Sequence, residues 1–326
     1  MIQYLRQRSP FQYVLLFVLV FALNISLFFH TTPVNIHNES LIFDIFSEFT
    51  STISNFWYVV ISLLTTYFVA LFINHIFNKF KLLDEINLFP AFIFIITGSM
   101  FPGIILLSPA SISFIILLIV IYNLLYLFDM EGAVQHLFFT AFYLSIASLI
   151  FFPVIILIVF IIISYPILKR LNWREFIIII IGIWVPFHLL MIYYYWNNSL
   201  TSFISNISGL YSGFRFPLNW KPVVELIPVS FLFLVLFIGF VKDSLVSGMR
   251  TVQKSRFMRV FAILLIITSV IFIFFTSNYL AFGIFLLLPV SFFLSTILTI
   301  GERRLNKIFF FVMIIISLGM QILKIQ

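Results

Sequence analysis

The stretch FQYVLLFVLVFALNISLFF, residues 11–29, runs for 19 positions without a charged residue. At 1.5 Å per residue a helix of that length covers about 28 Å, close to the roughly 30 Å hydrocarbon core of a bilayer. Arg6 and Arg8 precede the run, as in a secretory signal. The run is longer than a typical signal core, however, and no small-x-small cleavage site follows it. We therefore interpret it as a retained first membrane span.

The rest of the chain has the same character. Hydrophobic residues make up 63% of the 326 positions and charged residues 9%, with a mean hydropathy of +1.21, whereas soluble domains are about 45–50% apolar and about 25% charged. The sequence therefore predicts an all-α, polytopic transmembrane helix bundle of about eleven spans, within a range of about ten to twelve. The ten further apolar runs cover residues 56–76, 87–107, 111–128, 134–150, 152–168, 176–196, 223–241, 260–276, 279–299 and 308–323.

One of these runs carries several helix breakers. Pro90, Pro102 and Pro109, together with Gly98 and Gly103, lie within or beside residues 87–109. Proline removes a backbone donor and glycine adopts conformations that end helices, so this segment is predicted to break, to kink or to be re-entrant.

The basic residues predict the orientation. With the N-terminus in the cytoplasm and the sides alternating, 15 of the 18 basic residues fall in cytoplasmic segments, and Arg215, Lys221 and Lys324 fall outside them. This bias is the positive-inside rule. The net charge of +7 lies between apolar runs rather than on a soluble basic surface, which argues against nucleic acid as a partner. We expect an inner-membrane protein.

The chain reads as a single integral membrane domain over residues 1–326. The longest connections are the external loops 30–55 and 197–222 and the basic cytoplasmic loop 242–259. We expect that basic loop to rest on anionic lipid headgroups. Cysteine is absent from the sequence, which excludes disulfides and thiolate metal sites. The sequence indicates no particular cofactor.

The segment NESLIFDIFSEF, residues 38–49, contains three of the 11 acidic residues. Its apolar side chains recur on one helical face, with Asp44 and Glu48 on the other. The pattern predicts an amphipathic helix lying on the outer leaflet. Its carboxylates are either the solvated face of that helix or a catalytic pair that acts on an acceptor hydroxyl or holds a metal.

This layout resembles the membrane module of the C-type glycosyltransferases, in which an external loop with an acidic helix follows the first span. The resemblance implies that Asp44 or Glu48 serves as the catalytic acid or base. It also implies that Arg215 and Lys221, in GFRFPLNWKP, hold the phosphate of a polyprenyl-phosphate-linked donor. The external loop is short here, and no large soluble C-terminal domain is visible in the sequence.

Three further phrases lie between residues 86 and 187: INLFPAFIFIITGSMFPG, ASLIFFPVIILI and LNWREFIIIIIGIWVPF. They resemble an uncharacterised family of Phe/Ile-rich polytopic inner-membrane proteins of Bacteroidota, some of which carry a carotenoid-monooxygenase label. Membrane enzymes of that type hold iron with clustered histidines. The five histidines here are scattered along the sequence, which argues against the label.

Polar residues inside the predicted spans include Asn24, Asn123, His188 and the pair Thr65–Thr66. Such residues are either functional or join helices by hydrogen bonds. Three functions stay open: a glycosyltransferase-like handler of lipid-linked envelope precursors at the outer face, which we favour, a transporter or flippase, and a non-catalytic subunit of an envelope assembly. A discontinuous helix near Gly98 to Pro109 would favour the transporter. Asp44 or Glu48 in one cavity with Arg215 would favour the enzyme.

Overall fold

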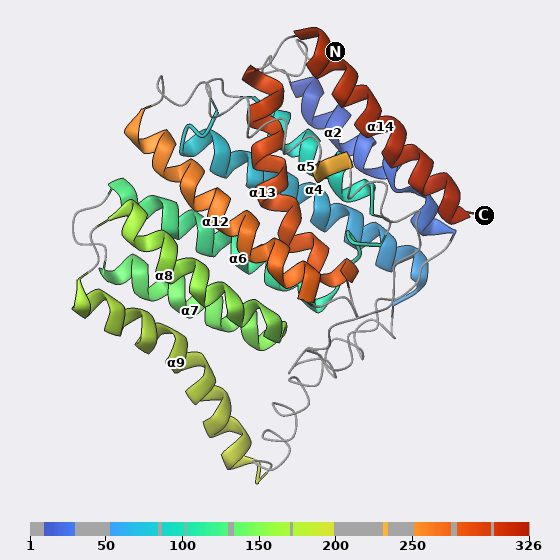
Figure 1. Ribbon diagram of the computed structural model, residues 1–326. Helices are drawn as coiled ribbons and strands as arrows, with labels where there is room; N and C mark the ends of the chain where they lie inside the picture. Colours follow the sequence, from blue (N-terminus) through green and yellow to red (C-terminus); the bar gives the residue numbers. More distant parts are fainter. Residues whose placement is uncertain are drawn as a thin grey trace.

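The computed structural model describes residues 10–29, 53–83, 87–101, 103–129, 134–169, 172–198, 231–233, 251–274, 279–300 and 303–325. Within these residues the regular structure is entirely helical (Figure 1). The all-α bundle predicted from the sequence is therefore confirmed. The helices are α2 (Pro10–Leu23), α4 (Asn55–Lys79), α5 (Phe89–Ser99), α6 (Pro109–Tyr126), α7 (Val134–Ile150), α8 (Leu157–Leu168), α9 (Trp173–Trp196), α12 (Val252–Phe274), α13 (Tyr279–Ile300) and α14 (Arg303–Ile325), with the 3-10 turns η1 (Ile25–Phe28), η2 (Leu127–Asp129) and η3 (Phe152–Ile156).

Ten of the eleven predicted apolar runs coincide with described helices, and of the remaining run, 223–241, only residues 231–233 are described. Five of the described helices are long and apolar enough to cross a membrane, namely α4, α6, α9, α12 and α13. Large apolar side chains such as Phe68 and Trp184 stand exposed on the outside of the bundle. These features identify a membrane protein, while its number of spans and its orientation stay predictions.

The helix starts follow local sequence signals. Asn172 and Glu175 form a capping box at the start of α9, in which the backbone N–H of Asn172 donates to Glu175 Oε2 at 2.9 Å. Helix α12 begins at Val252, directly after Thr251. The second half of the predicted loop 242–259 is therefore helical, and residues 242–250 lie outside the described part of the chain.

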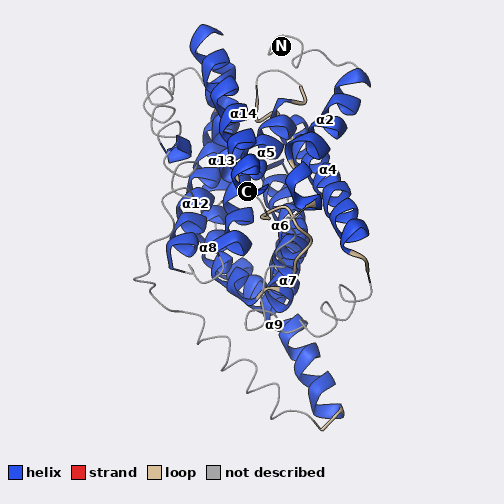
Figure 2. Cartoon of the chain, turned by 90° about the vertical axis from the view of Figure 1, so that its right-hand side faces the viewer, coloured by secondary structure: helices blue, strands red, loops and turns tan. Residues whose placement is uncertain are grey.

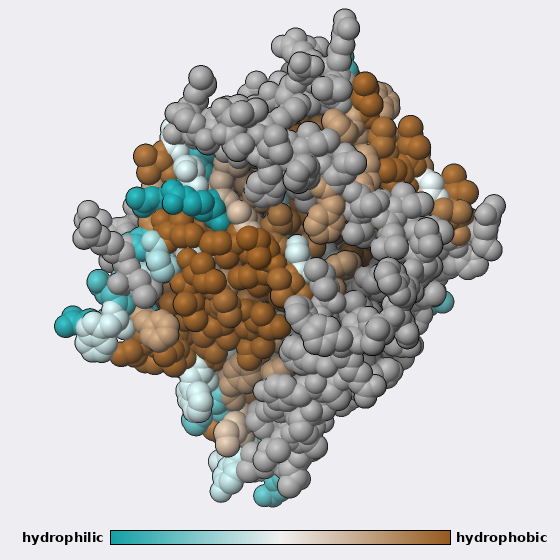
Figure 3. All heavy atoms as spheres, in the orientation of Figure 1, coloured by the Kyte–Doolittle hydropathy of each residue, from teal (hydrophilic) through white to brown (hydrophobic). Residues whose placement is uncertain are grey.

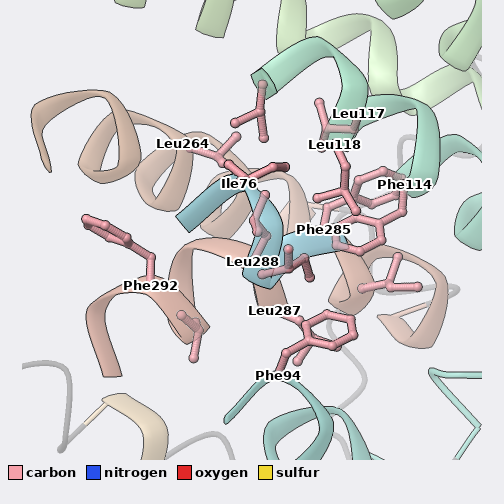
Figure 4. Packing of buried hydrophobic residues seen from close by; sticks show 14 of the residues in the cluster. Ile76, Phe94, Phe114, Leu117, Leu118, Leu264, Phe285, Leu287, Leu288 and Phe292 are labelled. Atoms are coloured by element: carbon pink, nitrogen blue, oxygen red, sulfur yellow. The ribbon is translucent and has the colours of Figure 1, made fainter. Parts of the chain in front are cut away.

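The centre of the bundle is built from α4, α5, α6, α12 and α13 (Figure 4). Helix α5 is buried along its whole length. Phe94 of α5 stacks on Phe114 of α6 with ring centroids 6.0 Å apart, and Phe114 meets Phe285 of α13 edge-on at 5.9 Å. Aromatic pairs in these geometries attract each other beyond the area that they bury.

Helix α9 lies at the edge of the bundle. It packs extensively against α7, and its C-terminal half extends away from the other helices (Figures 1 and 2). Its buried residues are Glu175, Ile179, Gly182 and Pro186, spaced four, three and four positions apart. That spacing is one narrow stripe of an α-helix, so the remaining surface of α9 faces outward.

Basic side chains gather where several helices end. Arg256 of α12 donates from Nη1 to the backbone oxygen of Leu168 in α8 at 2.9 Å, and its guanidinium lies 5.5 Å from the ring centre of Phe128. Phe80, which follows Lys79 at the end of α4, packs edge-on against Phe257 of α12. We call this the basic end of the bundle.

Figure 3 shows hydrophilic residues at the left edge and an apolar face between α8 and α12.

Candidate functional site

The four residues to which the sequence assigns chemistry are Asp44, Glu48, Arg215 and Lys221. All four lie outside the described residues, as does the whole acidic segment 38–49 that is predicted to form an amphipathic helix. Whether the carboxylates meet the cations therefore stays a prediction. The candidate site that the described residues do show is the interruption after α5.

The predicted break in residues 87–109 is confirmed. Helix α5 ends at Ser99 after 11 residues, and α6 begins only at Pro109. Gly103 has a φ of 100°, a conformation that glycine adopts readily and other residues rarely do. The intervening backbone folds into short turns, with the N–H of Ile104 bonded to Phe101 O at 3.1 Å and that of Leu106 to Gly103 O at 3.2 Å.

Hydroxyl groups of α4 hold the end of this irregular segment. The Tyr58 hydroxyl donates to the backbone oxygen of Leu107 at 2.5 Å, and Ser62 Oγ accepts from the N–H of Leu107 at 2.9 Å. Ser108 and Ser111 then form a capping box that starts α6. Irregular backbone inside a membrane protein requires such partners, because lipid offers none.

A polar cluster surrounds the C-terminal end of α5. It consists of Asn24, Ser26, Ser99 and Gln321, all of which are buried. Asn24 Nδ2 donates to Ser99 Oγ at 3.0 Å, and Gln321 Nε2 donates to the backbone oxygen of Ser99 at 2.9 Å. The Ser26 hydroxyl donates to Gln321 Oε1. The cluster therefore joins α2 with η1, α5 and α14 around the helix break.

Two buried polar atoms, one in the cluster and one a helical turn away from it along α14, have no hydrogen-bond partner among the described residues. They are Asn24 Oδ1 and the hydroxyl of Ser317, which lies one helical turn before Gln321. An unpaired buried acceptor or hydroxyl is costly, so such atoms usually mark a place for water or a ligand group. The sequence singled out Asn24 but not Ser317 or Gln321. These two residues could have been found from their spacing, because they are polar and lie four positions apart in the apolar run 308–323.

A small cavity lies on another side of the same break. Its volume is about 20 Å³, and its polar lining comes from Thr65, Thr66, Ser111 and Gly98, with apolar side chains around them. One water molecule needs a cavity of at least roughly 10–15 Å³. The cavity therefore has room for a single water but not for a sugar or a phosphate.

The chemistry available around the break is neutral hydrogen bonding. The members of the polar cluster are amides and hydroxyls, which stay uncharged near neutral pH. Within the described ranges, no three residues of the types His, Cys, Asp and Glu lie close enough together to hold a metal ion. His188 lies beside Trp184 on the outward surface of α9, with ring centroids 6.1 Å apart.

An apolar hollow of about 570 Å³ lies along the outside of α2. Phe17, Phe21, Ile25 and Phe28 are among the residues that line it. It offers no polar group to a reactant, which is the character of a surface in contact with lipid chains.

No curated protein matches the chain, and no solved structure matches it. A family model described as a family of unknown function, DUF6427, matches residues 22–326. The match covers nearly all of the chain, including the break after α5 and the polar residues of α14. The chain therefore belongs to the DUF6427 family.

Proposed function

We propose that this membrane protein is a transporter whose conducting path passes through the break after α5. The observation that carries the proposal is a short helix in the centre of the bundle, α5, which ends after 11 residues in irregular backbone, with the unpaired Asn24 Oδ1 beside its end. Transporters commonly place their sites at interrupted helices, because the freed backbone and nearby polar side chains can bind solute where lipid is excluded. A hydrogen-bonding solute without charge fits the amides and hydroxyls of the polar cluster.

The proposal requires the break to open. The cavity beside it has room for only one water, so a solute would pass only after α5 or the segment after it moves. Gly98 at the end of α5 packs against Leu287 of α13. A Cβ added to Gly98 would lie 3.4 Å from the Leu287 side chain. A side chain larger than alanine at position 98 would therefore act directly on this moving contact.

Cysteine accessibility tests the path. The chain contains no cysteine, so Thr66→Cys or Ser111→Cys would introduce a single thiol at the cavity. We expect both to react with a charged, membrane-impermeant methanethiosulfonate in proteoliposomes. The reagent is larger than the cavity, so reaction would require the path to open.

Two control variants bracket this measurement. Ser113→Cys places a thiol in the packed contact between α6 and α7, where the native hydroxyl donates to Ala147 O at 2.9 Å, and should not react. Asn197→Cys, at the exposed end of α9, should react fully. If the cavity thiols stay as unreactive as that of Ser113→Cys, the break is a structural feature and the transport proposal is wrong.

A second candidate function rests on a sequence observation. The acidic segment 38–49 and the cations Arg215 and Lys221 lie in the two predicted external loops. Carboxylates and cations in one cleft would suit a glycosyltransferase-like enzyme that handles lipid-linked envelope precursors, because cations hold the phosphate while a carboxylate acts on the acceptor. Substitution of Asp44 and Glu48 separates this function from transport.

A further inference from the structure

Aromatic rings from three helices form a continuous row at the basic end of the bundle. The ring of His75 in α4 stacks on Tyr122 in α6 at 6.3 Å, and Tyr122 stacks on Tyr126 at 6.3 Å. Tyr126 then meets His136 of α7 edge-on at 5.2 Å. We call His75, Tyr122, Tyr126 and His136 the aromatic row. The ends of α4 and α6 and the start of α7 that carry it lie on one side of the bundle (Figure 1).

Lys79 stands over the middle of the aromatic row. Its Nζ lies 4.3 Å from the ring centre of Tyr122 and 4.9 Å from that of Tyr126, and it donates to the Tyr122 hydroxyl. An ammonium group has three N–H donors, so this hydrogen bond leaves two for an anion. The side chain is exposed, and Tyr126 and His136 are partly exposed beside it. The row therefore presents one fixed cation among polar ring edges.

The surface beyond the row is apolar. On α4, Phe72 and Phe68 follow Lys79 and His75 at helical spacing, and Phe68 is 65% exposed. On α6, Ile119 and Ile115 continue the partly exposed face that carries Tyr122 and Tyr126. The exposed faces of α4 and α6 thus carry polar groups at the basic end and apolar side chains toward the opposite end.

We propose that Lys79 and the aromatic row bind the phosphate of an anionic phospholipid, whose acyl chains lie along Phe68, Ile115 and Ile119. Basic groups between membrane helices on the cytoplasmic side are typical headgroup sites. A free phosphate ion would use the polar groups alone, whereas the exposed apolar stripes match a molecule with both a phosphate and acyl chains. The polar groups of this site do not line the cavity beside the break after α5, although Ile115 of the apolar surface does. Headgroup binding therefore does not depend on the transport proposal.

The site also differs from the headgroup contact that the sequence predicts in loop 242–259. Arg256, one of the cations in that loop, already joins α12 to α8 through the oxygen of Leu168. Replacing it would disturb packing as well as charge. Lys79 bonds through its exposed ammonium group, so its replacement tests binding with less effect on the fold.

Native mass spectrometry of the full chain, released from detergent with phosphatidylglycerol or phosphatidylcholine, tests the proposal. We expect Lys79→Gln to weaken retention of phosphatidylglycerol about fivefold, the factor that corresponds to about 1 kcal/mol for one cation near the membrane surface. Tyr122→Phe, which keeps the ring and removes the hydroxyl, should have a smaller effect. Lys307→Gln removes another exposed charge, on α14, and should weaken retention less, because the aromatic row lies on α4, α6 and α7.

Two further outcomes decide the class of ligand. Millimolar inorganic phosphate should fail to displace phosphatidylglycerol, because the acyl chains contribute to binding; displacement would show a site for free phosphate. Retention of phosphatidylcholine equal to that of phosphatidylglycerol would overturn the preference for an anionic lipid. Retention by Lys79→Gln equal to that of the unsubstituted chain would overturn the site itself.

Discussion

Gly182 of α9 and Ala141 of α7 bring their two helices into close contact. A Cβ placed on Gly182 would lie 2.8 Å from the Ala141 Cβ and 2.9 Å from the backbone oxygen of Phe138. In the same contact the Ser145 hydroxyl of α7 donates to the backbone oxygen of Ile183 at 2.8 Å. Small residues and one hydrogen bond therefore hold α9 to its main neighbour, as is common between membrane helices.

We expect Gly182→Val to destabilise the protein by about 1–3 kcal/mol, since the added side chain would push α9 away from α7. Thermal unfolding of the purified protein in detergent measures the change. Gly319→Ala in α14 is the control, because nothing lies within 4 Å of its added Cβ. It should be neutral or stabilising, because alanine favours helix more than glycine does. Equal effects of the two variants would refute the close contact.

Gln321→Leu should destabilise the protein by about 0.6–1.7 kcal/mol, between the average and the maximum found for hydrogen bonds between membrane helices. The change removes two hydrogen bonds: the one that the Ser26 hydroxyl donates to Gln321, and the one that Gln321 donates to the backbone oxygen of Ser99. Ser317→Ala, one turn away, removes a hydroxyl that has no described partner and should cost less. Chemical or thermal unfolding of both variants checks the order; the reverse order would mean that Ser317 has the more important partner.

Reporter fusions test the orientation. Fusions after residues 80, 170, 250 and 305 should read cytoplasmic, and fusions near residues 45 and 210 should read external, because 15 of the 18 basic residues then lie on the cytoplasmic side. An external result at residue 250 combined with a cytoplasmic one at residue 80 would show that a span between them has been miscounted.

Asp44→Asn and Glu48→Gln test the lipid-linked sugar hypothesis. If either carboxylate acts on an acceptor hydroxyl, its replacement by the amide should abolish the activity, because an amide cannot serve as a general acid or base. The measurement is mass spectrometry of lipid-linked saccharides in a deletion strain complemented with each variant. Glu39→Gln, in the first turn of the same predicted helix, is the matched control and should be silent. Silent results for all three would identify a solvated helix face.

Most of the fold could be predicted from local sequence. Apolar runs determine the helices because their length and composition are local properties, and the proline and glycine residues around Gly103 marked the break after α5 for the same reason. The start of α12 was placed too late, because its first two turns, with Lys254 and Arg256, are polar but contain no helix breaker.

The candidate sites depend on contacts that no local pattern reveals. Gln321 meets Ser26 across 295 positions of sequence, and His75 joins His136 only through the rings of α6. The histidines looked scattered because they lie on separate helices, and helix rotation decides which faces meet. Both sites required the packed structure.

The exposed tryptophans at the two ends of α9 have a consequence for the surrounding bilayer. Trp173 and Trp196 are 71% and 83% exposed, and 23 helical steps separate them by about 35 Å. Tryptophan prefers the headgroup level, so this pair marks a preferred hydrophobic thickness. Because α9 packs mainly on α7, it can adjust its tilt to a thinner or thicker membrane while the other helices keep their packing. Hydrophobic mismatch would then act on the position of α9 first.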